Sequence, residues 1–226
     1  MTHAVVVGTF LAFCPLLIVI GRHQHRRGRG QRFDCSLAGV CAILWITINL
    51  WPLVIGQYDP NIAIPLHVSD LTALTATIVL ARPARWLRAI LYFWGLGLGI
   101  QAFIQPDLRD GPAHAGFWWF WANHFIICGV AVYDLAARGF RPAWRDYVTA
   151  VLAGFVYIGV VLPLDVLFDV NYGYVGPGMP GQPSLIDHLG PWPWRVLVMI
   201  AMGLVVFALM VLPWEVARRR RARVPS

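Results

Sequence analysis

The chain has 226 residues, of which 58% are hydrophobic and only 13% are charged, and its formal net charge is +7. A soluble domain carries about 25% charged residues, so this composition nearly excludes a soluble globular domain, excludes a disordered chain and predicts a multi-pass membrane protein. The charge does not indicate nucleic-acid binding. All 18 basic residues are arginines, and most lie in short clusters between apolar runs rather than on one basic face.

Seven apolar runs follow one another along the chain, most of them about 20 residues long, which is the length that an α-helix needs to cross a bilayer. We therefore predict an all-α bundle of seven transmembrane helices that forms a single membrane domain over residues 1–226, with a basic cytoplasmic tail at 215–226. The predicted spans cover residues 3–21, 35–55, 66–81, 86–105, 116–136, 147–167 and 192–214. Gly95 and Gly99 in the fourth span have the spacing of a helix-packing face.

Arginine is distributed unevenly among the loops. Sixteen arginines lie in the 22–34, 82–88 and 137–146 loops and the tail, whereas only Arg109 and Arg195 lie on the opposite side. Because loops rich in arginine stay in the cytoplasm, we predict that the N-terminus is outside and that the C-terminus is cytoplasmic.

The polar side chains of the spans are predicted to gather in the outer half of the bundle or just beyond it. Ionisable groups are costly inside a membrane unless they are paired or hydrated. Their clustering therefore indicates either a functional site or an ion-paired network that only fixes helix packing. The residues concerned are His67, Ser69, Asp70, Gln101, His114, Asn123, His124, Asp165, Asn171, Tyr172 and Arg195.

Within this cluster, Ser69 and His124 are a candidate nucleophile and base. The third span is about 24 Å long against a hydrocarbon core of about 30 Å, so its outer end is expected to be sunken, with Ser69 and His124 at similar depth. A histidine can accept the serine proton, and the free N–H groups that begin the span could stabilise an oxyanion. Asp70 or His67 could orient the pair, although we expect no direct contact between Ser69 and Asp70. The alternative is that Ser69 only packs.

Metal and cofactor sites are not predicted. Of His67, His114 and His124, only the last lies well inside a span, and no pair of them has the i,i+4 spacing of a ligand pair. The four cysteines form no CxxC pair, so neither disulfides nor a zinc site is indicated. Cys128 lies one turn below His124, and we interpret it as a small hydrophobic residue.

Several segments resemble one family of membrane proteins. The segments are PLHVSDLTAL, YFWGLGLGIQAFIQPDL, HAGFWWFWANH, NYGYV and PSLIDHLGPWPW. They resemble the YwaF family of bacterial integral membrane proteins, and the broader group includes the eukaryotic lipid acyltransferase called transmembrane protein 164. The resemblance covers roughly residues 50–200. It implies a bundle of six or seven helices in the bacterial plasma membrane, with membrane lipids as partners. A more distant similarity is to the androgen-induced-protein family of membrane hydrolases, which use a threonine and a histidine on fatty-acid esters.

The resemblance also implies an activity. The eukaryotic acyltransferase carries a cysteine nucleophile in an H-x-C-D motif and a partner histidine in a later span. Here the matching stretch is His67-Val68-Ser69-Asp70, with serine in place of cysteine, and the matching histidine is His124. The implied function is an intramembrane lipid acyltransferase or lipid-ester hydrolase that opens to the outer leaflet. We expect the substrate to contact Trp94, Gln101, His114, Asn123, Asn171 and Tyr172.

Two other functions remain open at this point. A lipid or small-molecule carrier, or a receptor-like binding bundle, would use the same polar pocket without covalent chemistry. A structural membrane protein would instead assist an enzyme encoded elsewhere. The oligomeric state is not indicated by the sequence.

Overall fold

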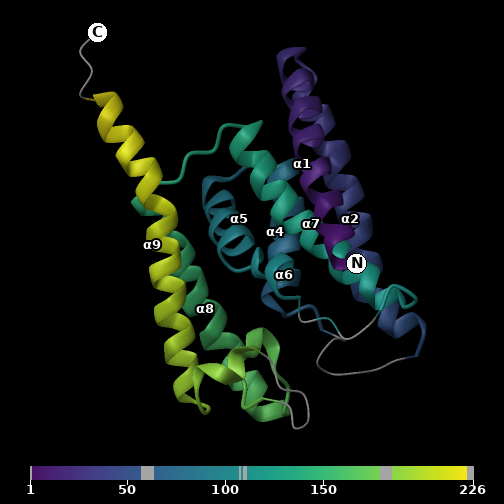
Figure 1. Cartoon of the computed structure of the whole chain (residues 1–226), viewed down its shortest axis with the longest axis vertical. Helices are drawn as coiled ribbons and strands as arrows, with labels where there is room; N and C mark the ends of the chain where they lie inside the picture. Colours follow the sequence, from purple (N-terminus) through teal and green to yellow (C-terminus); the bar gives the residue numbers. More distant parts are fainter. Residues whose placement is uncertain (1, 57–63, 107, 109–110, 179–184, 223–226) are drawn as a thin grey trace. The chain divides into compact units, whose positions relative to one another are not determined.

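The computed structural model describes residues 2–56, 64–106, 108, 111–178 and 185–222, and all regular structure in these residues is helical. The chain divides into two compact units, Met1–Phe140 and Arg141–Ser226. The first unit contains α1 (Thr2–Arg26), α2 (Gly30–Val54), α4 (Val68–Ala81), α5 (Arg85–Gly97), α6 (Gln101–Ile104) and α7 (Ala115–Ala136) (Figure 1). The second unit contains α8 (Trp144–Phe168), the 3-10 turns η1 (Tyr172–Tyr174) and η2 (Leu185–Leu189), and α9 (Trp194–Ala222).

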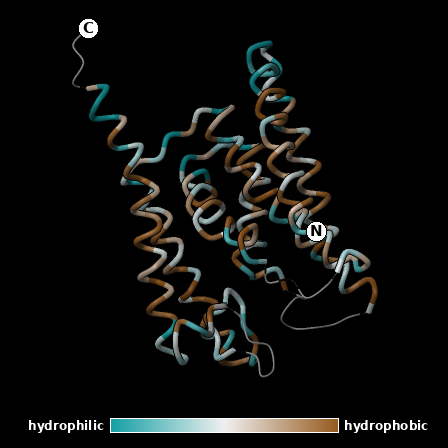
Figure 2. Tube along the Cα trace, viewed as in Figure 1, coloured by the Kyte–Doolittle hydropathy of each residue, from teal (hydrophilic) through white to brown (hydrophobic). Residues whose placement is uncertain are grey.

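Six helical segments of the described chain are long and apolar enough to cross a membrane. They are His3–Arg26, Gly30–Val54, Arg85–Ile104, Ala115–Ala136, Trp144–Phe168 and Trp194–Ala222. Apolar residues cover the middle of these helices, and hydrophilic residues gather where α1 ends and α2 begins (Figure 2). An all-helical, multi-pass membrane protein is therefore confirmed, whereas the seventh span and the orientation of the termini stay predictions.

The predicted third span corresponds to α4, which is much shorter than α1, α2 and α7 and lies among the helices of the first unit. Its 14 residues are about 21 Å long at 1.5 Å per residue, less than the roughly 30 Å of a hydrocarbon core. Ala73, Ala76, Val79 and Leu80 are fully buried, and α4 packs against α2, α5 and α7. Small residues on α4 allow this close approach. The helix therefore forms the centre of the first unit.

The predicted fourth span is interrupted. The helix α5 ends at Gly97, and the chain turns before α6 begins at Gln101. Three glycines in the stretch GLGLG weaken the helix here, because glycine is a poor helix former. Gly95 also has a packing role, since a Cβ at this position would lie 3.3 Å from Ile127 on α7. The predicted packing face is thus observed at Gly95, next to an unpredicted break.

Several helices extend beyond the predicted apolar runs. The helix α1 continues to Arg26, and α2 already begins at Gly30, so both include part of the arginine-rich loop. At the other end of the chain, α9 continues to Ala222 and includes most of the predicted tail, whose residues 223–226 lie outside the described part. Arginine is a good helix former, which explains why the helices extend past the apolar stretches.

A buried ionic network lies at the end of the first unit where α7 ends. The Tyr133 hydroxyl donates to Oδ1 of Asp34 at 2.6 Å, and Nε of Arg138 lies 3.2 Å from Oδ2 of the same carboxylate. Asp134 accepts from Nε of Arg88 at 2.7 Å. Both carboxylates are almost fully buried. This second polar group lies apart from the cluster that was predicted in the outer half of the spans, and the sequence did not indicate it. Asp34 and Asp134 lie at the ends of apolar runs, beside arginine clusters.

Candidate functional site

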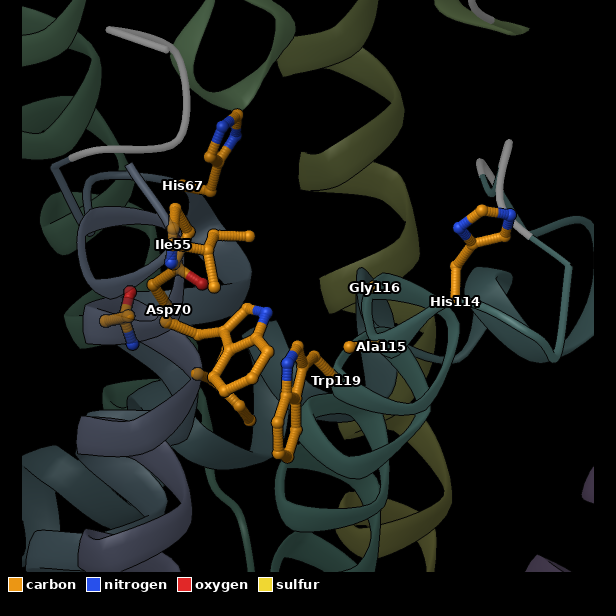
Figure 3. Close-up of a pocket in the computed structure, with 11 residues that line it drawn as sticks. Ile55, His67, Asp70, His114, Ala115, Gly116 and Trp119 are labelled. Carbon is orange, nitrogen blue, oxygen red and sulfur yellow. The ribbon is translucent and has the colours of Figure 1, made fainter. Parts of the chain in front are cut away.

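A cavity of about 430 Å³ opens in the first unit where three helix ends meet. The C-terminal part of α2, the start of α4 and the start of α7 surround it. In Figure 3, His67 and Asp70 lie on one side, His114, Ala115 and Gly116 lie on the other, and Trp119 lies between them. The complete lining is Ile48, Asn49, Trp51, Pro52, Ile55, His67, Asp70, His114, Ala115, Gly116 and Trp119. Three members of the predicted polar cluster thus lie at one cavity.

The start of α4 forms the polar wall of this cavity. His67 is the N-cap residue in an extended conformation, and Asp70 lies in the first turn. The Asp70 carboxylate interacts with the backbone of His67 and with the Ser69 side chain, and its Oδ1 lies 3.4 Å from Nδ2 of Asn123. The contact with Ser69 corrects the expectation that these two neighbours would not meet. A serine hydroxyl rotates to suit a nearby acceptor, so a hydrogen bond to the next residue's carboxylate does not require the two side chains to share one helix face.

Asp70 is also fixed through its backbone. Its carbonyl oxygen accepts a hydrogen bond from Nε1 of Trp45 on α2 at 2.8 Å. Asn123 on α7 is buried, with 6% of its surface exposed, and its Oδ1 has no partner among the described residues. Trp45 and Asn123 therefore hold Asp70 from two neighbouring helices. Asn123 was predicted to contact the substrate, and the sequence did not indicate a role for Trp45.

Ser69 and His124 are not joined by a hydrogen bond in the described part of the chain, and neither lines the cavity. Nδ1 of His124 lies 2.8 Å from the carbonyl oxygen of Phe120, one turn earlier on α7, and the two rings are 4.3 Å apart. This bond makes Nδ1 the donor, so that Nε2 is the nitrogen that can accept a proton. The neighbouring Asn123, about 100° away around the helix, is the residue of α7 that contacts Asp70.

Two helix starts give the cavity an unusual electrostatic character. His114 is the N-cap residue of α7, as His67 is for α4, and neither side chain caps its helix by a hydrogen bond. The first N–H groups of a helix lack partners within it and carry the positive end of the helix dipole. Ala115 and Gly116, which begin α7, line the cavity directly. The cavity therefore combines one carboxylate with groups suited to negative charge on a ligand or an intermediate.

Trp119 adds a further polar atom to the wall. Its Nε1 is buried and has no hydrogen-bond partner among the described residues. A buried N–H group without a partner is costly, so a ligand oxygen in the cavity would satisfy it. In the part of the chain that the structure describes, no group of three metal-ligating side chains is found.

The remaining predicted site residues lie elsewhere. Trp94 is buried in the helix α5, with 7% of its surface exposed, and Gln101 is exposed at the start of α6. Neither residue lines the cavity. The assignment of these two residues to a substrate stays a prediction.

Asn171 and Tyr172 belong to the second unit, where they build a compact loop after α8. The backbone N–H of Tyr172 donates to Oδ1 of Asp165 at 2.8 Å, and Oδ1 of Asn171 accepts from the N–H of Gly176 at 3.0 Å. Nη2 of Arg195 on α9 donates a hydrogen bond to the Gly176 carbonyl oxygen at 2.7 Å. The loop of residues 171–176 is thus held by Asp165 and Arg195. Arg109 lies outside the described residues.

These helices and their buried polar groups define a multi-pass α-helical membrane protein with a polar cavity at the ends of three helices. Comparison with protein families places it more narrowly. The model of the TMEM164 family matches residues 1–211, and the chain belongs to this family. No curated protein and no solved structure matches the chain. The expected relationship to transmembrane protein 164 is therefore confirmed at the level of the family.

Proposed function

We propose that the protein is an intramembrane lipid acyltransferase or lipid-ester hydrolase whose reaction takes place at the cavity between α2, α4 and α7. The observation that carries the proposal is the polar group at the start of α4. Ser69 lies beside the half-buried Asp70 carboxylate, which Asn123 also contacts, and His67 and Asp70 of the same turn line the cavity. A lipid ester is the natural acyl donor for a site among membrane helices. The likeness of the HVSD stretch to the H-x-C-D motif supports the same assignment.

In the proposed reaction, Oγ of Ser69 attacks the ester carbonyl carbon while Nε2 of His124 takes the hydroxyl proton. The oxyanion is stabilised by N–H groups at a helix start. Collapse of the intermediate breaks the ester C–O bond, and His124 returns the proton to the leaving alcohol. The hydroxyl group of a second lipid, or water, then attacks the acyl-serine and regenerates Ser69. Ser69 and His124 have to approach each other when substrate binds, which is common for catalytic pairs in ligand-free structures.

His67 is the competing candidate for the base. It interacts electrostatically with Asp70 and lines the cavity, whereas His124 does neither. In this version of the mechanism Asp70 orients His67, and His124 holds the pocket together through its contact with Phe120. The two versions differ in which histidine variant loses the activity.

The test is a lipidomic comparison of membranes that contain the wild type, Ser69→Ala, His124→Ala or His67→Ala. Ser36→Ala is the matched serine control, because Ser36 is exposed on α2 and its hydroxyl bonds to the Arg32 carbonyl within the helix. Ser69→Ala and the variant of the true base should both lose the lipid product. Their double variant should be little worse than either alone, because residues that act as a unit are not additive. A serine-directed lipid phosphonate should label the wild type at Ser69.

A second candidate function is favoured by the absence of a Ser69–His124 hydrogen bond among the described residues. The cavity would then bind a lipid or a small molecule, without covalent chemistry, through Asp70, His114 and the Trp119 N–H group. Full product formation by Ser69→Ala would rule out the covalent mechanism. Loss of ligand binding in Asp70→Asn and His114→Ala, together with unchanged lipids in Ser69→Ala, would establish the binding function instead.

A further inference from the structure

A cluster of exposed arginines lies where α1 ends and α2 begins. Arg26, Arg27, Arg29 and Arg32 all expose their side chains there. Arg82, which is also exposed, follows directly after Ala81, whose carbonyl accepts a hydrogen bond from Nε2 of Gln31 at 3.2 Å. That bond brings the end of α4 to the start of α2, and so adds Arg82 to the cluster. We call these five residues the arginine surface.

The arginine surface has no acidic partner in the part of the chain that the structure describes. The carboxylates at this end of the first unit are Asp34 and Asp134, with 0% and 2% of their surface exposed. Their interactions are with Tyr133, Arg138, His25 and Arg88. The five arginines of the surface take part in none of the ion pairs of the described residues, so their charge is directed outward.

The backbone of the turn is ordered, which holds these charges in place. The N–H of Arg29 donates to the Gln24 carbonyl at 2.9 Å, and the N–H of Gly28 donates to the His25 carbonyl at 3.1 Å. Gly28 has a positive φ of 71°, a conformation that favours glycine. Gly30 is buried against the His25 ring, which leaves no room for a Cβ. An ordered turn loses less conformational freedom on binding a ligand than a mobile arginine tail would.

The position of the turn indicates the partner. The 25 residues of α1 are about 37 Å long, which exceeds the roughly 30 Å of a hydrocarbon core. The exposed residues Val19 and Ile20 on α1 and Val40 on α2 are apolar and suited to lipid. The arginines beyond them therefore lie at the depth of the lipid headgroups. Guanidinium groups bind phosphate oxygens through paired hydrogen bonds.

We propose that the arginine surface binds the headgroups of acidic phospholipids and gives the protein a preference for an anionic leaflet at this end of the first unit. The inference does not depend on the proposed activity or on the cavity, which involves other ends of the helices. Each arginine near an acidic membrane surface strengthens binding by about fivefold. Three such residues acting together are expected to change the preference by tenfold or more.

The test uses the full chain purified in detergent and two fluorescent lipids with the same acyl chains, phosphatidylglycerol and phosphatidylcholine. The wild type is compared with the triple variant Arg26→Gln, Arg29→Gln and Arg32→Gln. The control is the double variant Arg218→Gln and Arg219→Gln on α9, which removes two arginines whose side chains already pair with Glu215. The wild type and the α9 variant should bind phosphatidylglycerol more tightly than phosphatidylcholine. In the variant of the arginine surface, the ratio of the two affinities should be at least tenfold smaller.

Several results would overturn the proposal. They are equal binding of the two lipids by the wild type, an unchanged preference in the triple variant, and displacement of phosphatidylglycerol by inorganic pyrophosphate at equal concentration. The last result would show a general anion site rather than a lipid surface. If the triple variant does not fold, a salt series on the wild type decides instead. Salt screens exposed charges. The preference for phosphatidylglycerol should therefore fall as the NaCl concentration is raised from about 50 to about 500 mM, and a constant preference would refute the proposal.

Discussion

Replacement of Asp34 by alanine should destabilise the first unit more than any change at the cavity. The Asp34 carboxylate is fully buried and is contacted by the Tyr133 hydroxyl at 2.6 Å, by Nε of Arg138 at 3.2 Å and by Nε2 of His25 at 3.1 Å. The Arg138 side chain is only 6% exposed, so the variant leaves a buried cation without one of its carboxylates. Removing one partner of a buried ion pair costs about 3–5 kcal/mol.

Tyr133→Phe provides the matched comparison, because it removes one hydrogen bond to Asp34 and leaves the ion pairs in place. Its expected cost is about 1–3 kcal/mol. Unfolding in detergent is followed by the loss of helix content. The free energy of unfolding of Asp34→Ala should be well below that of Tyr133→Phe. The double variant should lose less unfolding free energy than the two single variants lose together, since the two residues share one network. A change of less than about 1 kcal/mol for Asp34→Ala would refute the reasoning, because only an exposed pair is that weak.

The other predictions concern packing and topology. Gly21→Ala on α1 places a methyl group into the Tyr133 ring and should cost about 1–3 kcal/mol in unfolding experiments, whereas Gly8→Ala on the same helix meets open space and should be neutral or stabilising. Gly176→Ala should cost a similar amount, because its Cβ would lie 2.6 Å from the Val170 carbonyl, and Gly159→Ala on α8 is its control. Tags in the 137–146 loop and at the C-terminus should be reachable only from the cytoplasm, and a tag in the 168–191 linker only from outside. A linker tag found inside would reverse the predicted topology.

The helical architecture could be predicted from the sequence because apolar runs in a membrane have few alternatives to helices. The positions of the helix ends were predicted less accurately. The helices α1 and α2 reach into the arginine loop, since nothing in that stretch opposes a helix until Gly28. The break after Gly97 was missed because the stretch GLGLG is as apolar as the residues around it, and hydropathy does not register the low helix propensity of glycine.

Part of the candidate site could also be predicted from the apolar runs. The positions of His67, Asp70 and His114 at helix starts follow from the boundaries of the apolar runs, and the structure places all three at one cavity. Which side chains touch depends on the rotation of each helix, and one residue corresponds to about 100°. Asn123 therefore faces Asp70 and the adjacent His124 does not. The link between Asp34 and Tyr133 joins residues 99 positions apart, a separation at which sequence spacing carries no information.

The short helix α4 connects the buried network to the cavity. Its C-terminal end is fixed, because Arg138 donates to the Val79 carbonyl at 2.8 Å and Gln31 donates to the Ala81 carbonyl at 3.2 Å. A helix about 21 Å long that is fixed at one face of a roughly 30 Å core has its other end below the opposite surface. We therefore expect the sunken end to be the one that begins at Val68, where the cavity lies. On this prediction, the depth of the cavity in the membrane depends on the ionic network at the far end of the same helix.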